Sequence, residues 1–102
     1  MTSQGNGQPA RYRVILSGVT RTALAQLSSK ARQEGAGQEF LAAVREIGRR
    51  LRNDPLGFGE PRYRLPALRL LVCEGMIAPL VVNFAVHEDR PLVFIRGFRL
   101  LL

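Results

Sequence analysis

The sequence PLVVNFAVHEDRPLVFIRGFRLL, residues 79–101, decides the predicted fold. Residues 80–86 and 92–100 are rich in Leu, Val, Ile and Phe, and the polar cluster at residues 87–90 separates them. Apolar runs of this length on either side of a short polar cluster indicate two strands joined by a hairpin turn. A third run of the same character, residues 68–74, comes shortly before, so the sequence predicts three sequential antiparallel strands.

The N-terminal half has the patterns of one strand and two helices. Residues 11–17 (RYRVILS) alternate and contain β-branched and aromatic side chains, which predicts a first strand. Apolar side chains recur at helical spacing over residues 20–34, and Gly35 follows as a helix C-terminal glycine does. A second helix is predicted over residues 38–54, where Asp54-Pro55 ends it. Its apolar stripe, which we expect to pack on the sheet, consists of Phe40, Val44, Ile47 and Leu51.

The remaining segments complete the predicted organisation. Residues 56–66 (LGFGEPRYRLP) contain two glycines and two prolines and are predicted to form an irregular connection. Residues 1–10 are small, polar and punctuated by Gly and Pro, so we expect a flexible leader before a single domain at residues 11–102. Helices segregated from a run of strands predict an α+β fold: an N-terminal strand, a two-helix hairpin and a three-stranded antiparallel meander.

The chain is strongly basic, because 15 Lys and Arg residues against 8 Asp and Glu give a formal net charge of +7. Such a domain is expected to meet a negatively charged partner: nucleic acid, an anionic surface or an acidic protein segment. Simple solubility is the alternative. Lys30 is the single lysine. The dominance of arginine favours forked recognition of phosphate or carboxylate, although a GC-rich genome produces the same bias.

Several function classes are disfavoured by composition. Cys73 and His87 are the single cysteine and the single histidine, too few ligands for a zinc site and no basis for an internal disulfide. The sequence has no glycine-rich phosphate loop, so we expect neither a metal nor a small-molecule cofactor. No apolar run reaches the ~18 residues of a membrane span, and no signal-peptide pattern opens the chain. The predicted location is the cytoplasm, with no membrane partner.

The first candidate binding residues lie in the predicted connection. Arg62 and Arg64 flank Tyr63, and Arg69 stands near the start of the next strand. Two arginines beside an aromatic ring are able to hold phosphates while the ring stacks on a base. The alternative is that Tyr63 closes the edge of the core while both arginines extend into water.

The last strand carries the second group of candidates, Arg96 and Arg99. Strict alternation places Phe94, Arg96 and Phe98 together on one side, and Gly97 on the side where a helix comes close. If the Gly97 side meets the helices, a cation lies between two aromatic rings on the open side, which suits stacking and phosphate binding. The alternative packs the Arg96 stem between the rings and pairs its head with Glu74 or Glu88.

A secondary basic face is predicted on the second helix. Its members are Arg45, Arg49, Arg50 and Arg52. Like charges at positions i and i+4 repel each other slightly, which a purely structural helix has no reason to adopt. The alternative is a solvated face on which Glu46 pairs with Arg49 or Arg50.

These segments together resemble the RelE/ParE superfamily of bacterial toxins. The resemblance rests on the opening strand YRVIL, the helical hairpin ending in LRNDP, the connection FGEPRYRLPALRL and the closing hairpin at residues 79–101. It covers residues 11–101. It implies a RelE-like fold and a toxin that a cognate antitoxin silences. RelE-type members cleave messenger RNA in the ribosomal A site, whereas ParE-type members poison DNA gyrase.

The sequence departs from the ribonuclease pattern at two places. The ribonucleases place a basic residue and a tyrosine after the last strand, but this chain has Leu100, Leu101 and Leu102 there. Leu80 and Val81 stand where an arginine is common. The catalytic residues are therefore unknown, while Arg69, Arg96 and Arg99 match possible phosphate ligands by position.

The predicted function is that of a toxin acting on the translation machinery as a ribosome-dependent mRNA interferase. Two alternatives stay open: a ParE-like or catalytically degenerate member that inhibits a protein target such as gyrase, and a non-toxic nucleic-acid-binding module. The predicted partners are a cognate antitoxin and either ribosome and mRNA or DNA gyrase. We expect an apolar patch at Phe94 and Phe98 to be buried against the antitoxin.

Overall fold

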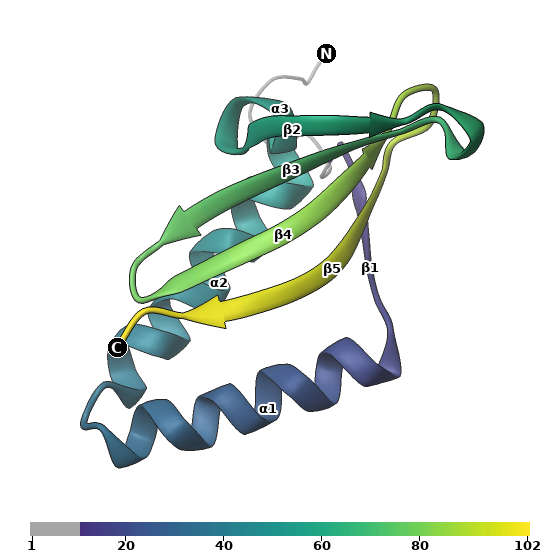
Figure 1. The fold of residues 1–102 in the computed structure, drawn as a ribbon. Helices are drawn as coiled ribbons and strands as arrows, with labels where there is room; N and C mark the ends of the chain where they lie inside the picture. The colour runs from purple at the N-terminus through teal and green to yellow at the C-terminus, as the bar shows by residue number, and fades with distance from the viewer. Residues whose placement is uncertain (1–10) are drawn as a thin grey trace.

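The computed structural model describes residues 11–102, so the leader predicted at residues 1–10 lies outside the described residues (Figure 1). The elements follow the order strand, helices, then strands. They are β1 (Arg13–Leu16), α1 (Gly18–Gln33), α2 (Gly37–Asn53), α3 (Pro55–Phe58), β2 (Glu60–Leu65), a 3₁₀ turn η1 (Pro66–Leu68), β3 (Leu70–Ile77), β4 (Leu80–His87) and β5 (Leu92–Leu100). The predicted α+β class is confirmed.

Local chemistry at the helix ends explains the helical hairpin. The Ser17 hydroxyl accepts a hydrogen bond from the Thr20 N–H at 3.2 Å, which caps the N-terminus of α1. Gly35 has a φ of 77°, the left-handed conformation that ends a helix and that glycine adopts without steric cost. The predicted glycine at the end of the first helix is thereby confirmed, and α2 begins two residues later.

The five strands form one sheet in the order β1-β5-β4-β3-β2. The antiparallel meander runs from β2 to β5, and β1 pairs in parallel with β5 at the other edge. The meander therefore contains one strand more than predicted, because residues 56–66 are not an irregular connection. Their first part belongs to α3, and residues 60–65 form β2. Pro61 is tolerated there because β2 is an edge strand, where a missing N–H costs no ladder bond.

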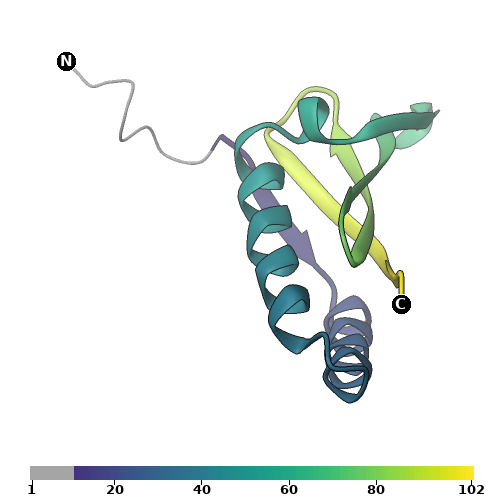
Figure 2. The same ribbon diagram turned by 90° about the vertical axis from the view of Figure 1, so that its left-hand side faces the viewer.

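Both long helices cover the same face of the sheet (Figure 2), which we call the helix-covered face. Buried α2 residues Phe40, Ile47 and Leu51 belong to one core cluster with Phe84 from the centre of β4. The Phe84 ring stacks on Phe58 of α3, with 6.1 Å between ring centroids. The predicted packing of the α2 stripe is confirmed, although Val44 is only partly buried. The opposite side of the sheet, which no helix within residues 11–102 covers, is the open face.

Two bulges interrupt the alternation of the sheet. In β5, Gly97 pairs with Asn83 and Ile95 pairs with Phe84, so Arg96 is an extra residue. Beyond this bulge the sides exchange: Phe98 packs against the core, while Gly97 lies on the open face. The prediction that Phe94, Arg96 and Phe98 share the open side is therefore wrong for Phe98. The prediction that a helix approaches Gly97 is also wrong, since nothing lies within 4 Å of where its Cβ would stand.

Candidate nucleic-acid interface

A row of apolar and aromatic residues crosses the open face from edge to edge. Neighbouring strands place in one register line Tyr63, Val72, Ala85, Phe94 and Ile15. Two of the three inner side chains are fully covered, with Val72 exposing 0% and Ala85 1% of their surface. Tyr63 is 51% exposed at one end. The open face thus has a small apolar floor with an accessible aromatic ring beside it.

Arg96 of β5 and Tyr63 of β2 meet over this floor. The Arg96 guanidinium donates a hydrogen bond of 2.9 Å from Nη1 to the Tyr63 hydroxyl. Two strands, β4 and β3, lie between the strands that carry these residues, so the side chains have to reach toward each other across the sheet. None of residues 11–102 offers Arg96 a carboxylate at ion-pair distance. The predicted pairing of Arg96 with Glu74 or Glu88 is therefore not found.

Glu74 instead holds two other predicted ligands on the open face. The Arg62 Nη2 atom lies 2.9 Å from Glu74 Oε1, and Arg99 Nη1 lies 3.6 Å from Glu74 Oε2. The hydrogen bond from Arg62 is the main cause of a lowered Glu74 pKa, which keeps this carboxylate ionised. Glu60 also approaches Arg62, at 3.5 Å. These contacts hold the two guanidinium groups in place.

Both bulged positions of the sheet are arginines of this group. Between Pro61 and Tyr63 the register of β2 shifts, which makes Arg62 the extra residue there as Arg96 is in β5. Their ladder partners are adjacent, since the β2 bulge faces Val72–Cys73 and the β5 bulge faces Asn83–Phe84. Bulges re-aim side chains and are frequent next to functional sites. Here the two bulges bring arginines from separate strands onto one face.

Arg64 and Arg69 lie elsewhere, at the end of the sheet beside the β4–β5 hairpin. Arg64 pairs with Glu88 and Arg69 pairs with Asp89. Arg69 has a φ of 56°, and its carbonyl accepts a hydrogen bond from the Glu88 N–H at 2.9 Å. The pairing with Arg69 lowers the pKa of Asp89. Arg64 and Arg69 therefore do not join Arg62, Arg96 and Arg99 on the open face.

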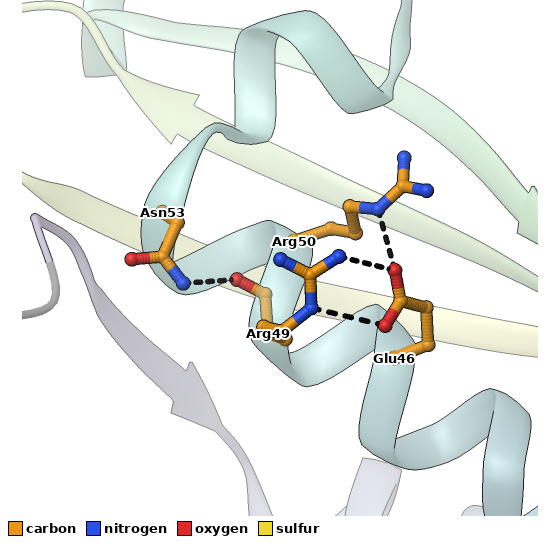
Figure 3. A network of polar contacts seen from close by, with 4 residues as sticks. All are labelled: Glu46, Arg49, Arg50 and Asn53. Carbon is orange, nitrogen blue, oxygen red and sulfur yellow. Dashed lines mark hydrogen bonds and ion pairs between the residues drawn. The ribbon is translucent and has the colours of Figure 1, made fainter.

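The secondary basic face of α2 is partly neutralised by Glu46 (Figure 3). Glu46 accepts from Arg49 at 2.6 and 3.0 Å and from Arg50 at 2.7 Å. Hydrogen bonds from Arg49 first, and then from Arg50, lower the pKa of Glu46 to about 2. The Arg50 guanidinium also lies over the Phe58 ring, 5.7 Å from its centroid. The alternative interpretation, in which Glu46 pairs on a solvated face, is confirmed for these two arginines.

Arg45 and Arg52, the other predicted members of this face, make no ion pair with any of residues 11–102. Both line a hollow between α2, β1 and β5, and the Arg52 guanidinium extends over Gly48. They lie on the helix side of the molecule. The secondary basic face and the open face are thus separate surfaces.

The sequence analysis missed two residues of the open face, Asn83 and Gly97. They pair across β4 and β5 and line a hollow of about 310 Å³ together with Glu74 and Arg99. Asn83 is the one polar residue in the interior of the apolar strand 80–86. That position in the sequence could have indicated that Asn83 lies on the open face, because a polar side chain within such a strand has to point away from the core.

Little acid–base chemistry is available on the open face. Cys73 is buried, and burial raises the pKa of its thiol. His87 lies in the hairpin, where its Nδ1 accepts hydrogen bonds from the Asp89 and Arg90 N–H groups at 3.0 and 3.1 Å. Tyr63 is the phenol on this face. Among residues 11–102 no cluster of His, Cys, Asp and Glu suits a metal ion, and no helix is long and apolar enough to cross a membrane.

Comparison of the chain with models of protein families, with curated proteins and with solved structures finds no match. The element order, with a first strand, two helices and an antiparallel meander, is consistent with the RelE-like topology.

Proposed function

We propose that the open face binds the phosphates of single-stranded RNA through Arg96, Arg62 and Arg99. The observation that carries this proposal is Arg96: a bulge projects it onto the open face, a tyrosine hydroxyl orients it, and no carboxylate within residues 11–102 neutralises it. A guanidinium that donates one hydrogen bond to a hydroxyl and has no carboxylate partner still has other N–H groups with which it is able to bind a phosphate. The exposed Tyr63 ring supplies a stacking surface beside it, as single-strand binders commonly do.

The proposal places this protein among toxins of the RelE/ParE type, acting in the cytoplasm on ribosome-bound mRNA and silenced by an antitoxin. Support comes from the element order, the net charge of +7 and the arginines of the open face. The proposal does not require the predicted Phe94 and Phe98 patch, because Phe98 is part of the core packing.

In RNA cleavage the 2′ oxygen attacks the adjacent phosphorus and forms a 2′,3′-cyclic phosphate, its proton passing to water. The bond from phosphorus to the 5′ oxygen breaks, and this surface then requires a group that protonates the leaving 5′ oxygen. The main chain at Leu101 is tied to the β3–β4 turn by a hydrogen bond from its N–H to the Pro79 carbonyl, at 2.7 Å, and the residues there are leucines. Tyr63 is the phenol on the open face, and we propose it for this role. Its oxygen accepts from Arg96, so its own O–H proton is directed elsewhere. We assign Tyr63 the proton-donor role in the ribonuclease form of the proposal.

The test is a salt series of RNA binding with the double variant Arg96→Ala/Arg99→Ala. The logarithm of the association constant falls with the logarithm of salt by about 0.7 per phosphate neutralised on a single strand. We expect each of the two arginines to account for about one phosphate, so that the variant shows a slope shallower by about 1.4 in total. A fluorescent, unstructured oligonucleotide and a circular-dichroism check of folding are sufficient for the measurement.

Arg64→Ala is the matched control, because Arg64 lies on the same strand as Arg62 but pairs with Glu88 away from the open face. Its slope should equal that of the unmodified protein. A slope unchanged in the folded double variant contradicts the proposal. If expression of that variant still arrests growth, the better interpretation is the alternative protein target, such as gyrase. A slope reduced only in Arg45→Ala/Arg49→Ala moves the RNA site to α2.

A further inference from the structure

We propose that the hollow at Asn83 and Gly97 receives one unstacked base of the bound RNA, and that Asn83 selects adenine. This inference rests on the proposed function, since it assumes that the open face binds RNA. It adds a base-reading position to a surface that otherwise contacts phosphates.

The absence of a side chain at Gly97 creates the hollow. The glycine does not serve packing, because a Cβ there would meet nothing within 4 Å. It does not serve an unusual backbone conformation either, since Gly97 is not among the positive-φ glycines of the described chain. A side chain at position 97 would project from the open face beside Asn83, its ladder partner. What the glycine provides is space: a hollow of about 310 Å³.

The wall of this hollow contains a side-chain amide that has no hydrogen-bond partner in the described part of the chain. Asn83 is half-buried, and its side-chain amide makes no hydrogen bond with any of residues 11–102. An amide offers two donors and one acceptor oxygen in one plane. The edge of adenine that carries N6 and N7 presents one donor beside one acceptor, which is the pattern that Asn binds with two hydrogen bonds.

Two of the proposed phosphate ligands belong to the strand that carries Gly97. Arg99 lines the same hollow, and Arg96 directly precedes Gly97 in β5. Glu74, the ladder partner of Asn83 on β3, also lines the hollow, and its carboxylate repels phosphate. A nucleotide on this face is therefore expected to bind with its phosphate toward the guanidinium groups and its base toward the uncharged amide. RNA proteins read unstacked bases in this way.

The experiment compares the binding of four fluorescent oligonucleotides by the unmodified protein and by Asn83→Ala. Three are the homopolymers oligo(A), oligo(C) and oligo(U), and the fourth is an unstructured G-containing oligonucleotide. A good bidentate contact discriminates between bases by ~1 to 3 kcal/mol, so we expect oligo(A) to bind between about fivefold and about 150-fold more tightly. In Asn83→Ala the four affinities should become equal within about twofold, while the salt dependence stays that of the unmodified protein.

Gly97→Leu should fill the hollow and abolish the preference, and Gly18→Leu is its control. Gly18 also has nothing within 4 Å of its Cβ position but lies at the start of α1.

Equal affinity of the unmodified protein for all four oligonucleotides overturns this inference and leaves salt-dependent RNA binding standing. So does a preference that persists in folded Asn83→Ala. A preference for another base that Asn83→Ala removes overturns the choice of adenine. No binding of any oligonucleotide at low salt overturns the inference together with the proposed function.

Discussion

The hydroxyl of Tyr63 and the guanidinium of Arg96 are joined by a 2.9 Å hydrogen bond, although 33 positions separate the two residues in sequence. Tyr63 comes from one edge strand of the sheet and Arg96 from the strand next to the other edge. Each side chain limits the rotamers of the other. The bond therefore fixes an arginine and a phenol over the apolar floor before any ligand arrives, which lowers the entropy cost of binding one.

The first prediction concerns Tyr63→Phe, which keeps the ring and removes the hydroxyl. We expect ribosome-dependent cleavage of mRNA to fall by about 10²-fold or more, because a positioned general acid contributes at least that much. RNA binding should weaken by no more than about tenfold, since stacking is retained and only the hydrogen bond that orients Arg96 is lost. Primer extension on messages in a translation extract measures the cleavage. Tyr12→Phe is the control, because Tyr12 packs against the core; an equal loss in both variants would remove Tyr63 from the chemistry.

A second prediction contrasts two glycines. A Cβ at Gly59 would collide with the Phe84 ring and come within 3.0 Å of the Cys73 Cβ, in the tightly packed core. Gly59→Ala should lower the free energy of unfolding by ~1 to 3 kcal/mol, the usual cost of overpacking. Gly97→Ala meets no atoms and should be neutral or stabilising by up to ~1 kcal/mol, because alanine has less freedom in the unfolded chain. Urea denaturation of both variants measures these changes in the free energy of unfolding. Equal changes in the two variants would contradict the packing at the end of α3.

The third prediction tests the helix-covered face. Ile47 is 2% exposed and belongs to the main core cluster. Ile47→Ala should lower the free energy of unfolding by ~2 to 4 kcal/mol, through lost burial and the cavity left behind. Leu41, on the same helix but 46% exposed, provides the comparison, and Leu41→Ala should cost less than ~1 kcal/mol. A loss below half a kcal/mol at Ile47, on the order of a surface change, would place α2 elsewhere.

The spacing of apolar residues was sufficient to predict the helices and the strands β3, β4 and β5. Each of these elements has a run of apolar residues that is buried in the core. It was insufficient for β2, which is an exposed edge strand with proline and glycine around it, so that its local composition is that of a loop. β2 becomes a strand because β3 offers a ladder to pair with. Pairing of this kind is a tertiary effect that local composition does not record.

The site was predicted less completely than the fold, and the bulges are the reason. Alternation assigns every second residue to one face, whereas an extra residue at Arg96 reverses the assignment for Phe98 and Gly97. The partners of the arginines also depend on the complete topology: Arg62 reaches Glu74 because β2 lies beside β3, and Arg64 reaches Glu88 across 24 positions. The sequence therefore names candidate arginines, but which of them lie together on one face depends on the assembled sheet.

The last prediction concerns acid stability and Glu46. Its pKa is lowered from 4.5 to about 2 in the folded protein, chiefly by the hydrogen bonds from Arg49. A carboxyl group with a lowered folded pKa takes up its proton more readily when the chain is unfolded. Its contribution to stability is therefore complete above pH 4.5 and is lost as the pH falls toward 2. Glu74 and Asp89, whose pKa values are also lowered by arginine partners, act in the same direction.

Glu46→Gln isolates the part that belongs to α2. The amide does not titrate, so the urea midpoint of this variant should fall less steeply than that of the unmodified protein between pH 4.5 and about 2. At neutral pH the variant should be the less stable of the two, because it has lost the charged partner of Arg49 and Arg50. Arg45→Ala serves as the control, since it removes a charge from the same helix but leaves both Glu46 ion pairs intact. Parallel pH profiles for Glu46→Gln and the unmodified protein would show that the Glu46 contacts do not hold in solution.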